Sequence, residues 1–315
     1  MSKDEKKPFR VILWCVPRAV STAISKCFSF IDNTESWLEP FCGLYTLETS
    51  CAPMGIPLPQ NEGEIDDFLE KLEATVKDTP LEPFMKKEGI NRSMLLLRKI
   101  QERLNSAPAD KNVFVKDIAI AAQGRYDYFP VGYRHTFLIR HPERMFPSFR
   151  KMIIDWGLKS NLIPEAAAED MIKYFDFTRD LPNATPGFPY DCQYNLWRHI
   201  KENYEEQPVV MDVDEMLANP GKMLPKFFEA AGMPWDEKYL RWDPSPEGAL
   251  DWHWVFKMEM DKVSFGNIHK EAVTSSEFGP SKPLVPRDQM TPDIIKSVDG
   301  AIEYYNEMAA TRITI

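Results

Sequence analysis

The stretch that decides the fold is WCVPRAVSTAISKCF, residues 14–28. It ends an apolar run, crosses a Pro-Arg pair and resumes as a helix-compatible segment opened by Ser21 and Thr22. The first N–H groups of a helix have no intrahelical acceptor and lie at its positive end, so this junction predicts a phosphate or sulfate site. Arg18 and the two hydroxyls would add charge and donors. The alternative is a buried strand followed by a capped helix, with Ser21 or Thr22 as the N-cap.

Apolar runs rich in β-formers recur along the chain, and helical patterns follow most of them. The runs cover residues 10–16, 112–120, 135–140 and 208–213, and the helical patterns cover 21–31, 142–156 and 214–231. Short buried strands that alternate with helices are typical of a mostly parallel sheet covered on both faces. The sequence therefore predicts an α/β fold, a three-layer sandwich with a mostly parallel central sheet.

We expect one domain spanning residues 1–315, with an insertion and an irregular end. The insertion, at about 42–110, combines a Pro-rich loop, an acidic amphipathic stretch at 63–78 and a helix-like segment at 91–104. It either shapes a substrate pocket or forms a merely structural helical cap. From about residue 243 the chain is rich in Pro, Trp and Ser, which predicts a loop-rich C-terminal segment over the body.

Composition narrows the function classes. A formal net charge of −10 argues against a protein that covers nucleic acid or a polysulfated glycan by bulk electrostatics, so a bound anion needs a local pocket. The five cysteines include no Cys-x-x-Cys pair, which favours reduced intracellular thiols over a zinc site or disulfides. The polar N-terminus and the absence of an apolar run of about 18 residues predict a cytoplasmic protein without a membrane partner.

Chemistry-bearing residues follow three predicted strands. The first strand leads into residues 17–22, the second ends at Lys116 and Asp117, and the third ends at Arg140, with Ser148 inside the next helix. In open α/β sheets, ligands bind beyond the carboxyl ends of the strands. We therefore expect these cations and hydroxyls to form one anion site.

The P-loop of nucleotide triphosphatases is the obvious comparison for such a site. That loop requires G-x-x-x-x-G-K-[ST], and this one has neither the glycines nor the lysine. No convincing Asp follows an apolar strand to hold magnesium through the loop hydroxyl. The sequence therefore argues against a metal and weakens the nucleoside-triphosphate interpretation.

The same residues resemble the sulfotransferases that use 3′-phosphoadenosine 5′-phosphosulfate (PAPS). PRAVST, residues 17–22, is similar to their 5′-phosphosulfate loop P-[KR]-S-G-[ST]-T, and FLIRHPERMFPSF, residues 137–149, repeats their Arg-to-Ser spacing of eight. Residues 196–235 resemble the family's W-x-x-H helix, the following strand and the closing helix. The likeness covers roughly residues 9–40 and 110–240 and implies a P-loop-NTPase-like sulfotransferase fold with PAPS as cofactor and adenosine 3′,5′-bisphosphate (PAP) as product.

Two departures from the family pattern bear on the chemistry. Val20 stands where the loop usually has glycine, and the histidine that one subgroup uses as base would fall on Ile118. Another subgroup uses a glutamate just past the first helix, and SWLEPF places Glu39 there. Substrates vary widely in that branch, so the resemblance does not identify the acceptor.

The resemblance implies a role for each motif residue. Arg140 and Ser148 would bind the 3′-phosphate, which separates PAPS from ATP. The C-terminal residues Lys270, Ser275 or Lys282 would close over the cofactor. The residues that would bind the 5′-phosphosulfate are Pro17, Arg18, Ala19, Val20, Ser21 and Thr22.

Glu39 is the expected general base, and burial near Trp37 and Phe41 would raise its pKa toward neutrality. The alternative is a solvated glutamate at a helix exit. Lys116 would neutralise the bridging oxygen, unless it is a solvated edge residue or a partner of Asp117. Asp117 is a rival base, with pairing to Lys116 as its alternative.

For the acceptor, Trp252, His253 and Trp254 suggest an aromatic wall to which Trp156 would contribute, although such residues also build plain cores. We expect a small neutral or cationic acceptor that offers a hydroxyl or an amine. Two other functions stay open, a kinase-like ATP-dependent phosphotransferase and a catalytically silent nucleotide-binding relative. The oligomeric state is unknown from sequence.

Overall fold

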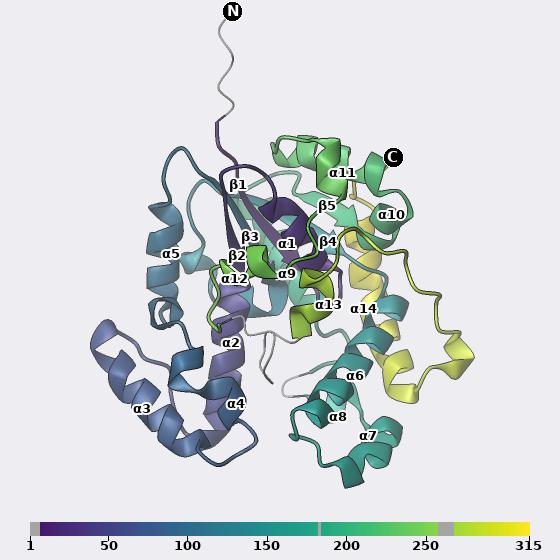
Figure 1. Cartoon of the computed structure of the whole chain (residues 1–315). Helices are drawn as coiled ribbons and strands as arrows, with labels where there is room; N and C mark the ends of the chain where they lie inside the picture. The colour runs from purple at the N-terminus through teal and green to yellow at the C-terminus, as the bar shows by residue number, and fades with distance from the viewer. Residues whose placement is uncertain (1–6, 182–183, 258–267) are drawn as a thin grey trace, which may run out of the picture.

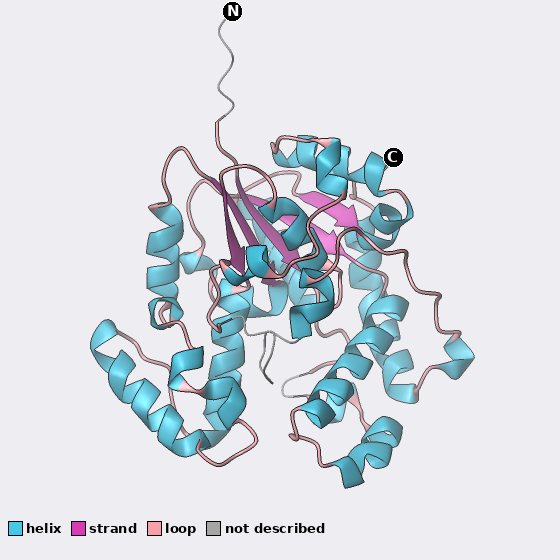
Figure 2. Ribbon diagram, viewed as in Figure 1, coloured by secondary structure: helices cyan, strands magenta, loops and turns pink. Residues whose placement is uncertain are grey.

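The computed structural model describes residues 7–181, 184–257 and 268–315. Its centre is a sheet of five parallel strands in the order β2-β3-β1-β4-β5, with helices on both faces (Figures 1 and 2). The strands are β1 (Arg10–Cys15), β2 (Thr34–Leu38), β3 (Asn112–Ile118), β4 (Arg134–Ile139) and β5 (Val209–Asp212). The predicted three-layer α/β sandwich is confirmed.

The α-helices of the described residues are α1 (Ser21–Ser29), α2 (Pro40–Cys51), α3 (Ile65–Val76), α4 (Glu82–Met85), α5 (Leu97–Asn105), α6 (Pro142–Lys159), α7 (Ala168–Tyr174), α8 (Phe177–Asp180), α9 (Tyr190–Asn203), α10 (Val213–Ala218), α11 (Pro220–Ala231), α12 (Glu247–Leu250), α13 (Lys270–Val273) and α14 (Pro292–Ala309). The helix predicted at 214–231 is two helices. Asn219 between them has φ −152° and ψ 70°, because a residue before proline disfavours the helical conformation.

Strand β2 is one element that the sequence analysis missed. It is a short edge strand whose first half is only partly buried, so TESWL lacks the continuous apolar run that marks β1. It pairs with β3 in parallel register, Leu38 opposite Lys116. Its carboxyl end therefore places residue 39 beside the end of β3.

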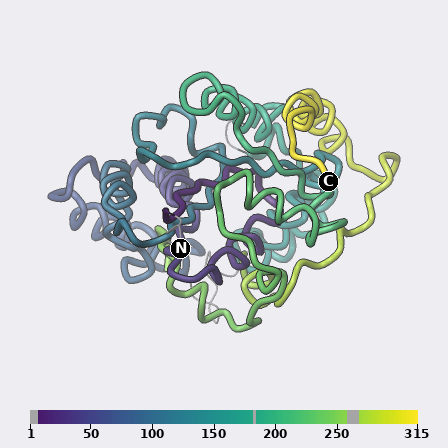
Figure 3. The backbone as a smooth tube through the Cα atoms, turned by 90° about the horizontal axis from the view of Figure 1, so that it is seen from above, coloured from purple at the N-terminus to yellow at the C-terminus, as the bar shows by residue number. Residues whose placement is uncertain are grey.

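Different parts of the chain cover the two edges of the sheet, formed by β2 and β5. The helices between β2 and β3, α2 to α5, lie on the β2 side, and α14 lies on the β5 side (Figure 3). Helix α14 is an addition to the expected loop-rich C-terminal segment, and its buried Ile294, Val298 and Ala301 recur at helical spacing. It packs against α6 and α9. No helix in the described part of the chain is long and apolar enough to cross a membrane.

Candidate active site

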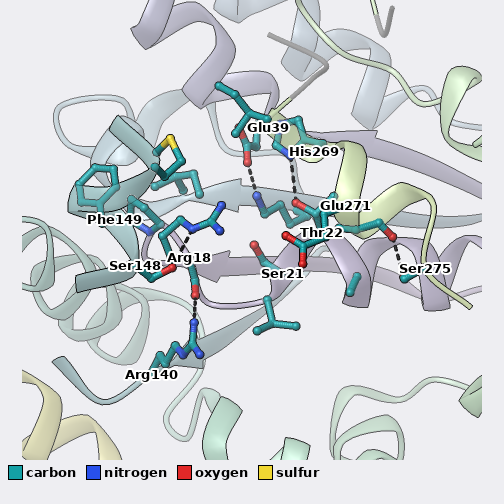
Figure 4. Close-up of a pocket in the computed structure, with 18 of the residues that line it drawn as sticks. Arg18, Ser21, Thr22, Glu39, Arg140, Ser148, Phe149, His269, Glu271 and Ser275 are labelled. Atoms are coloured by element: carbon teal, nitrogen blue, oxygen red, sulfur yellow. Dashed lines mark hydrogen bonds and ion pairs between the residues drawn. The ribbon is translucent and has the colours of Figure 1, made fainter. Parts of the chain in front are cut away.

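A cavity of about 490 Å³ lies where β1, β3 and β4 end (Figure 4). Every residue expected to touch the cofactor lines it except Ala19, which is buried, and Lys270, and Glu39 and Lys116 line it as well. The cofactor candidates that line it are Pro17, Arg18, Val20, Ser21, Thr22, Arg140, Ser148, Ser275 and Lys282. The structure therefore brings together residues up to 265 positions apart in sequence, Pro17 and Lys282.

The loop between β1 and α1 has the shape of an anion site. Arg18 and Val20 have positive φ angles, 61° and 59°, a conformation that is strained for a β-branched residue such as Val20. Val20 is the N-cap of α1 and makes no side-chain hydrogen bond to the helix, so the alternative in which Ser21 or Thr22 is the N-cap is wrong. The N–H groups of Ser21 and Thr22 have no acceptor within the described part of the chain. Exposed N–H groups at a helix start bind anions.

Two arginines and a serine meet beside this loop. Arg18 Nε donates a hydrogen bond to Ser148 Oγ (3.1 Å), and an Nη of Arg140 donates to the carbonyl of Arg18. Tyr190 in turn donates to the Arg140 carbonyl at 2.7 Å. Arg140 Nε is buried and has no partner among the described residues. Burial lowers the pKa of both guanidinium groups, so two poorly solvated cations face one cavity, which favours a bound anion.

Glu39 and Lys116 form a buried ion pair at the ends of β2 and β3. Lys116 is 1% exposed, and the Glu39 side chain is 12% exposed. Neither residue is the solvated side chain that each alternative assumed. Burial alone would raise the pKa of Glu39, but the Lys116 ammonium, together with His269, more than offsets burial and the pKa is lowered. The expected rise toward neutrality is therefore wrong, because the nearest cation favours the carboxylate.

Asp117 faces away from this pair. Its carboxylate accepts hydrogen bonds from the N–H groups of Phe41 (2.7 Å), Cys42 (3.0 Å) and Ile118 (2.8 Å). Successive side chains of a strand point to opposite faces, so Lys116 points at the cavity and Asp117 at the start of α2. Asp117 is thus a structural N-terminal partner of α2, and neither a base in the cavity nor the partner of Lys116.

The C-terminal segment is fastened over the cavity by two cations. Lys26 is buried and donates to the carbonyls of Val273 and Ser275, the latter at 2.9 Å. Arg144 donates to the carbonyl of Lys282. Ser275 and Lys282 therefore line the cavity as expected, whereas Lys270 lies outside its lining.

One cavity residue that the sequence analysis missed is His269. It is buried, and its Nδ1 lies 3.1 Å from Thr22 Oγ1, a contact that Figure 4 shows beside Glu39. No spacing in the sequence marks this histidine, because its partner in the loop lies 247 residues away.

Of the four residues expected in an aromatic wall, Trp254 lines the cavity. Trp252 and Trp156 lie outside the lining, and the His253 ring packs on Trp37 with ring centroids 4.6 Å apart. His253 Nε2 is also 3.2 Å from a Glu35 oxygen, which fixes it on the β2 edge.

Other apolar side chains complete the wall beside Trp254. Phe149 comes from α6, where Figure 4 shows it near Arg18 and Ser148, and Phe256 follows Trp254 by two residues. The cavity therefore combines a cationic floor with an apolar wall, which suits an anionic group and an apolar molecule together.

Neither the comparison with protein-family models nor that with curated protein sequences finds a match. The solved structures that are similar to the chain include three sulfotransferases, each at 12% identity. They are a sulfotransferase domain from the curacin biosynthetic pathway (TM-score 0.46, covering 95% of this chain and 98% of that one), a sulfotransferase domain from the Synechococcus PCC 7002 olefin synthase (0.41, 96% and 97%), and mouse sulfotransferase SULT7A1 complexed with PAP (0.42, 95% and 83%).

All three are sulfotransferases, the family that the sequence motifs resemble. At this identity the likeness concerns the fold alone.

Proposed function

We propose that this protein is a PAPS-dependent sulfotransferase, which transfers a sulfuryl group to a hydroxyl or amine of a small acceptor by in-line displacement. The observation that carries the proposal is the meeting of Arg18, Arg140 and Ser148 beside the open N–H groups of α1. The N–H groups of the loop would bind the 5′-phosphosulfate of the cofactor, and a second cation nearby would bind its 3′-phosphate. Arginine suits both, because its planar fork binds two oxygens of such a group.

The residues present fit the cofactor. The loop N–H groups and Arg18 would hold the 5′-phosphosulfate, and Arg140 with Ser148 would hold the 3′-phosphate. The fit rests on Arg140 Nε, a buried donor without a partner among the described residues, since such a donor costs free energy until an acceptor reaches it. PAPS would supply a sulfuryl group on a good phosphate leaving group.

Residues of this chain would supply a general base, cations that stabilise the developing negative charge, and a cavity that excludes water. Glu39 is kept ionised by Lys116, so it is ready to accept a proton from the acceptor. Lys116 and Arg18 are preorganised cations where negative charge would develop during transfer. The apolar wall with Trp254 would exclude water and hold the apolar part of a neutral or cationic acceptor.

A thermal-shift experiment tests the cofactor assignment. We expect PAP to raise the melting temperature, and ADP or ATP with magnesium to raise it much less. A ligand at about 100 times its Kd adds about 2.7 kcal/mol of stability, which is a shift of several degrees for a chain of this size. Arg140→Ala should lose the PAP shift.

Arg198→Ala is the matched control, because Arg198 is exposed on α9 and pairs only with Glu202 among the described acidic residues. It should keep the full PAP shift. Equal or greater stabilisation by ATP with magnesium would instead favour a kinase-like phosphotransferase. PAP binding without turnover of PAPS by any acceptor would favour a silent relative.

A further inference from the structure

His269 stands between the anion loop and the proposed base. It precedes α13 and lines the cavity, with Nδ1 3.1 Å from Thr22 Oγ1. Its ring meets Trp254 edge-on, with centroids 5.3 Å apart. Nε2 has no hydrogen-bond partner within the described part of the chain. One ring nitrogen thus contacts the loop, and no described residue bonds to the other, which a molecule in the cavity would reach.

The charged groups that act on His269 come from three elements. They are Glu39 before α2, Lys116 of β3 and Arg18 of the loop. Burial lowers the pKa of His269 to about 4; the two cations lower it as well, and Glu39 opposes them. The ring is therefore neutral at pH 7, and a neutral imidazole has one N–H donor and one acceptor lone pair. A bound anion would offset the two cations and make the ring more basic.

The Thr22 contact makes the position of the His269 ring proton depend on whether an anion is bound at the loop. Thr22 has a single hydroxyl proton. If that proton is donated to an anion at the loop, then the 3.1 Å contact requires Nδ1–H to donate to Thr22 Oγ1. Nδ1 then carries the ring proton, and Nε2 carries the lone pair. Without an anion, Thr22 is free to donate to Nδ1 instead, which leaves the proton on Nε2.

We propose that His269 is a second proton acceptor in the transfer, and that an anion on Thr22 selects the tautomer in which Nε2 can accept. This inference rests on the proposed function. As the acceptor O–H bond breaks, its electron pair forms the bond to sulfur, and its proton passes to the Glu39 carboxylate and from there to Nε2. The bridging S–O bond breaks with its pair on PAP. The imidazolium afterwards returns its proton to water. Nε2 carries its lone pair when an anion is bound at the loop. Binding of the sulfuryl donor therefore also prepares His269 to accept a proton.

Two-bond ¹H–¹⁵N spectra of histidine rings report the tautomer directly. The chain has five histidines, and the His269 signals are the ones absent from His269→Gln. With PAPS and no acceptor at pH 7, we expect His269 to be protonated on Nδ1 and to titrate at higher pH than in the free protein. In Thr22→Val, which keeps the side-chain shape but has no hydroxyl, PAPS should no longer select this tautomer.

Kinetic and binding measurements separate this inference from the proposed function. His269→Gln should bind PAP within a few-fold of wild type and lose about 10²-fold or more in kcat. The control is His253→Gln, which changes a histidine outside the cavity lining and should keep wild-type kcat. A wild type that binds neither PAP nor PAPS would overturn the proposed function and this inference with it. Bound PAPS with His269 still protonated on Nε2, or wild-type kcat in His269→Gln, would overturn this inference alone.

Discussion

The Lys116 ammonium pairs with the Glu39 carboxylate across the ends of two neighbouring parallel strands. The sheet register sets this pair, because Leu38 lies opposite Lys116 and the Glu39 N–H donates to the Lys116 carbonyl at 2.6 Å. The proposed base and its cation are therefore positioned by backbone hydrogen bonds as well as by their own attraction.

Glu39→Gln should keep cofactor binding and lose transfer. Glutamine has the same shape but accepts a proton poorly, so kcat should fall by about 10² to 10⁴. PAP affinity, measured by titration calorimetry, should stay within a few-fold. Glu35→Gln is the control, because Glu35 bonds Trp37 and His253 outside the cavity. Wild-type turnover by Glu39→Gln would show that Glu39 is not the base.

Lys116→Met should move the acid limb of the pH profile upward. Glu39 acts as a carboxylate, and Lys116 holds its pKa low, so in wild type the acid limb from this group lies below the ordinary glutamate range. Without the cation, only the smaller effect of His269 opposes burial, so the Glu39 pKa rises and activity is lost at a higher pH on acidification. The measurement is kcat/KM against pH for both proteins. An acid limb at the same pH in both proteins would show that Lys116 does not control the ionisation of the base.

The same variant should unfold more easily, in a pH-dependent way. Removing one partner of a buried pair costs about 3–5 kcal/mol. Because the folded pKa of Glu39 is depressed, its contribution is fully present above the unfolded value of about 4.3 and is lost as pH falls through the folded pKa. The difference in unfolding free energy between wild type and Lys116→Met should therefore shrink at low pH. Urea titrations at pH 7 and near pH 3 measure it.

Asp117→Ala should destabilise the fold without acting on the chemistry directly. Three backbone N–H groups lose their acceptor, and each buried orphan costs about 1–3 kcal/mol. Asp117→Asn keeps one oxygen and should lose less. Urea denaturation gives the free energies, and folded samples of either variant should bind PAP normally. A fully stable Asp117→Ala protein without turnover would return Asp117 to the role of rival base.

Val20→Gly tests the strain in the loop. Val20 has φ 59°, a conformation that costs a non-glycine residue about 1–2 kcal/mol. The release of this strain should offset the lost side chain and the greater freedom of glycine in the unfolded chain, so stability should change by less than about 1 kcal/mol. Val16→Gly, at a fully buried position in the same segment, should cost about 2 kcal/mol or more. Equal losses at both positions would contradict the strain.

Much of the fold and of the anion site is local in sequence and could be predicted. The run of β1 and the small residues of α1 set the strand–loop–helix junction. The spacing of eight puts Arg140 just before α6 and Ser148 inside that helix. These follow from backbone periodicity and chain connectivity, which neighbouring residues fix by themselves. The edge strand β2 was not predicted, because its half-exposed residue pattern resembles that of a loop.

Sequence patterns predict β1, β3, β4 and β5, the parallel sheet and the cations at the strand ends. The packing of distant segments settles which carboxylate meets Lys116, that the Glu39 pKa falls instead of rising, and that His269 reaches Thr22. The difference lies in the distance along the chain over which each interaction acts. Helices and strands depend on hydrogen bonds and side-chain patterns within a few residues, whereas ion pairing and burial depend on groups that only packing brings together.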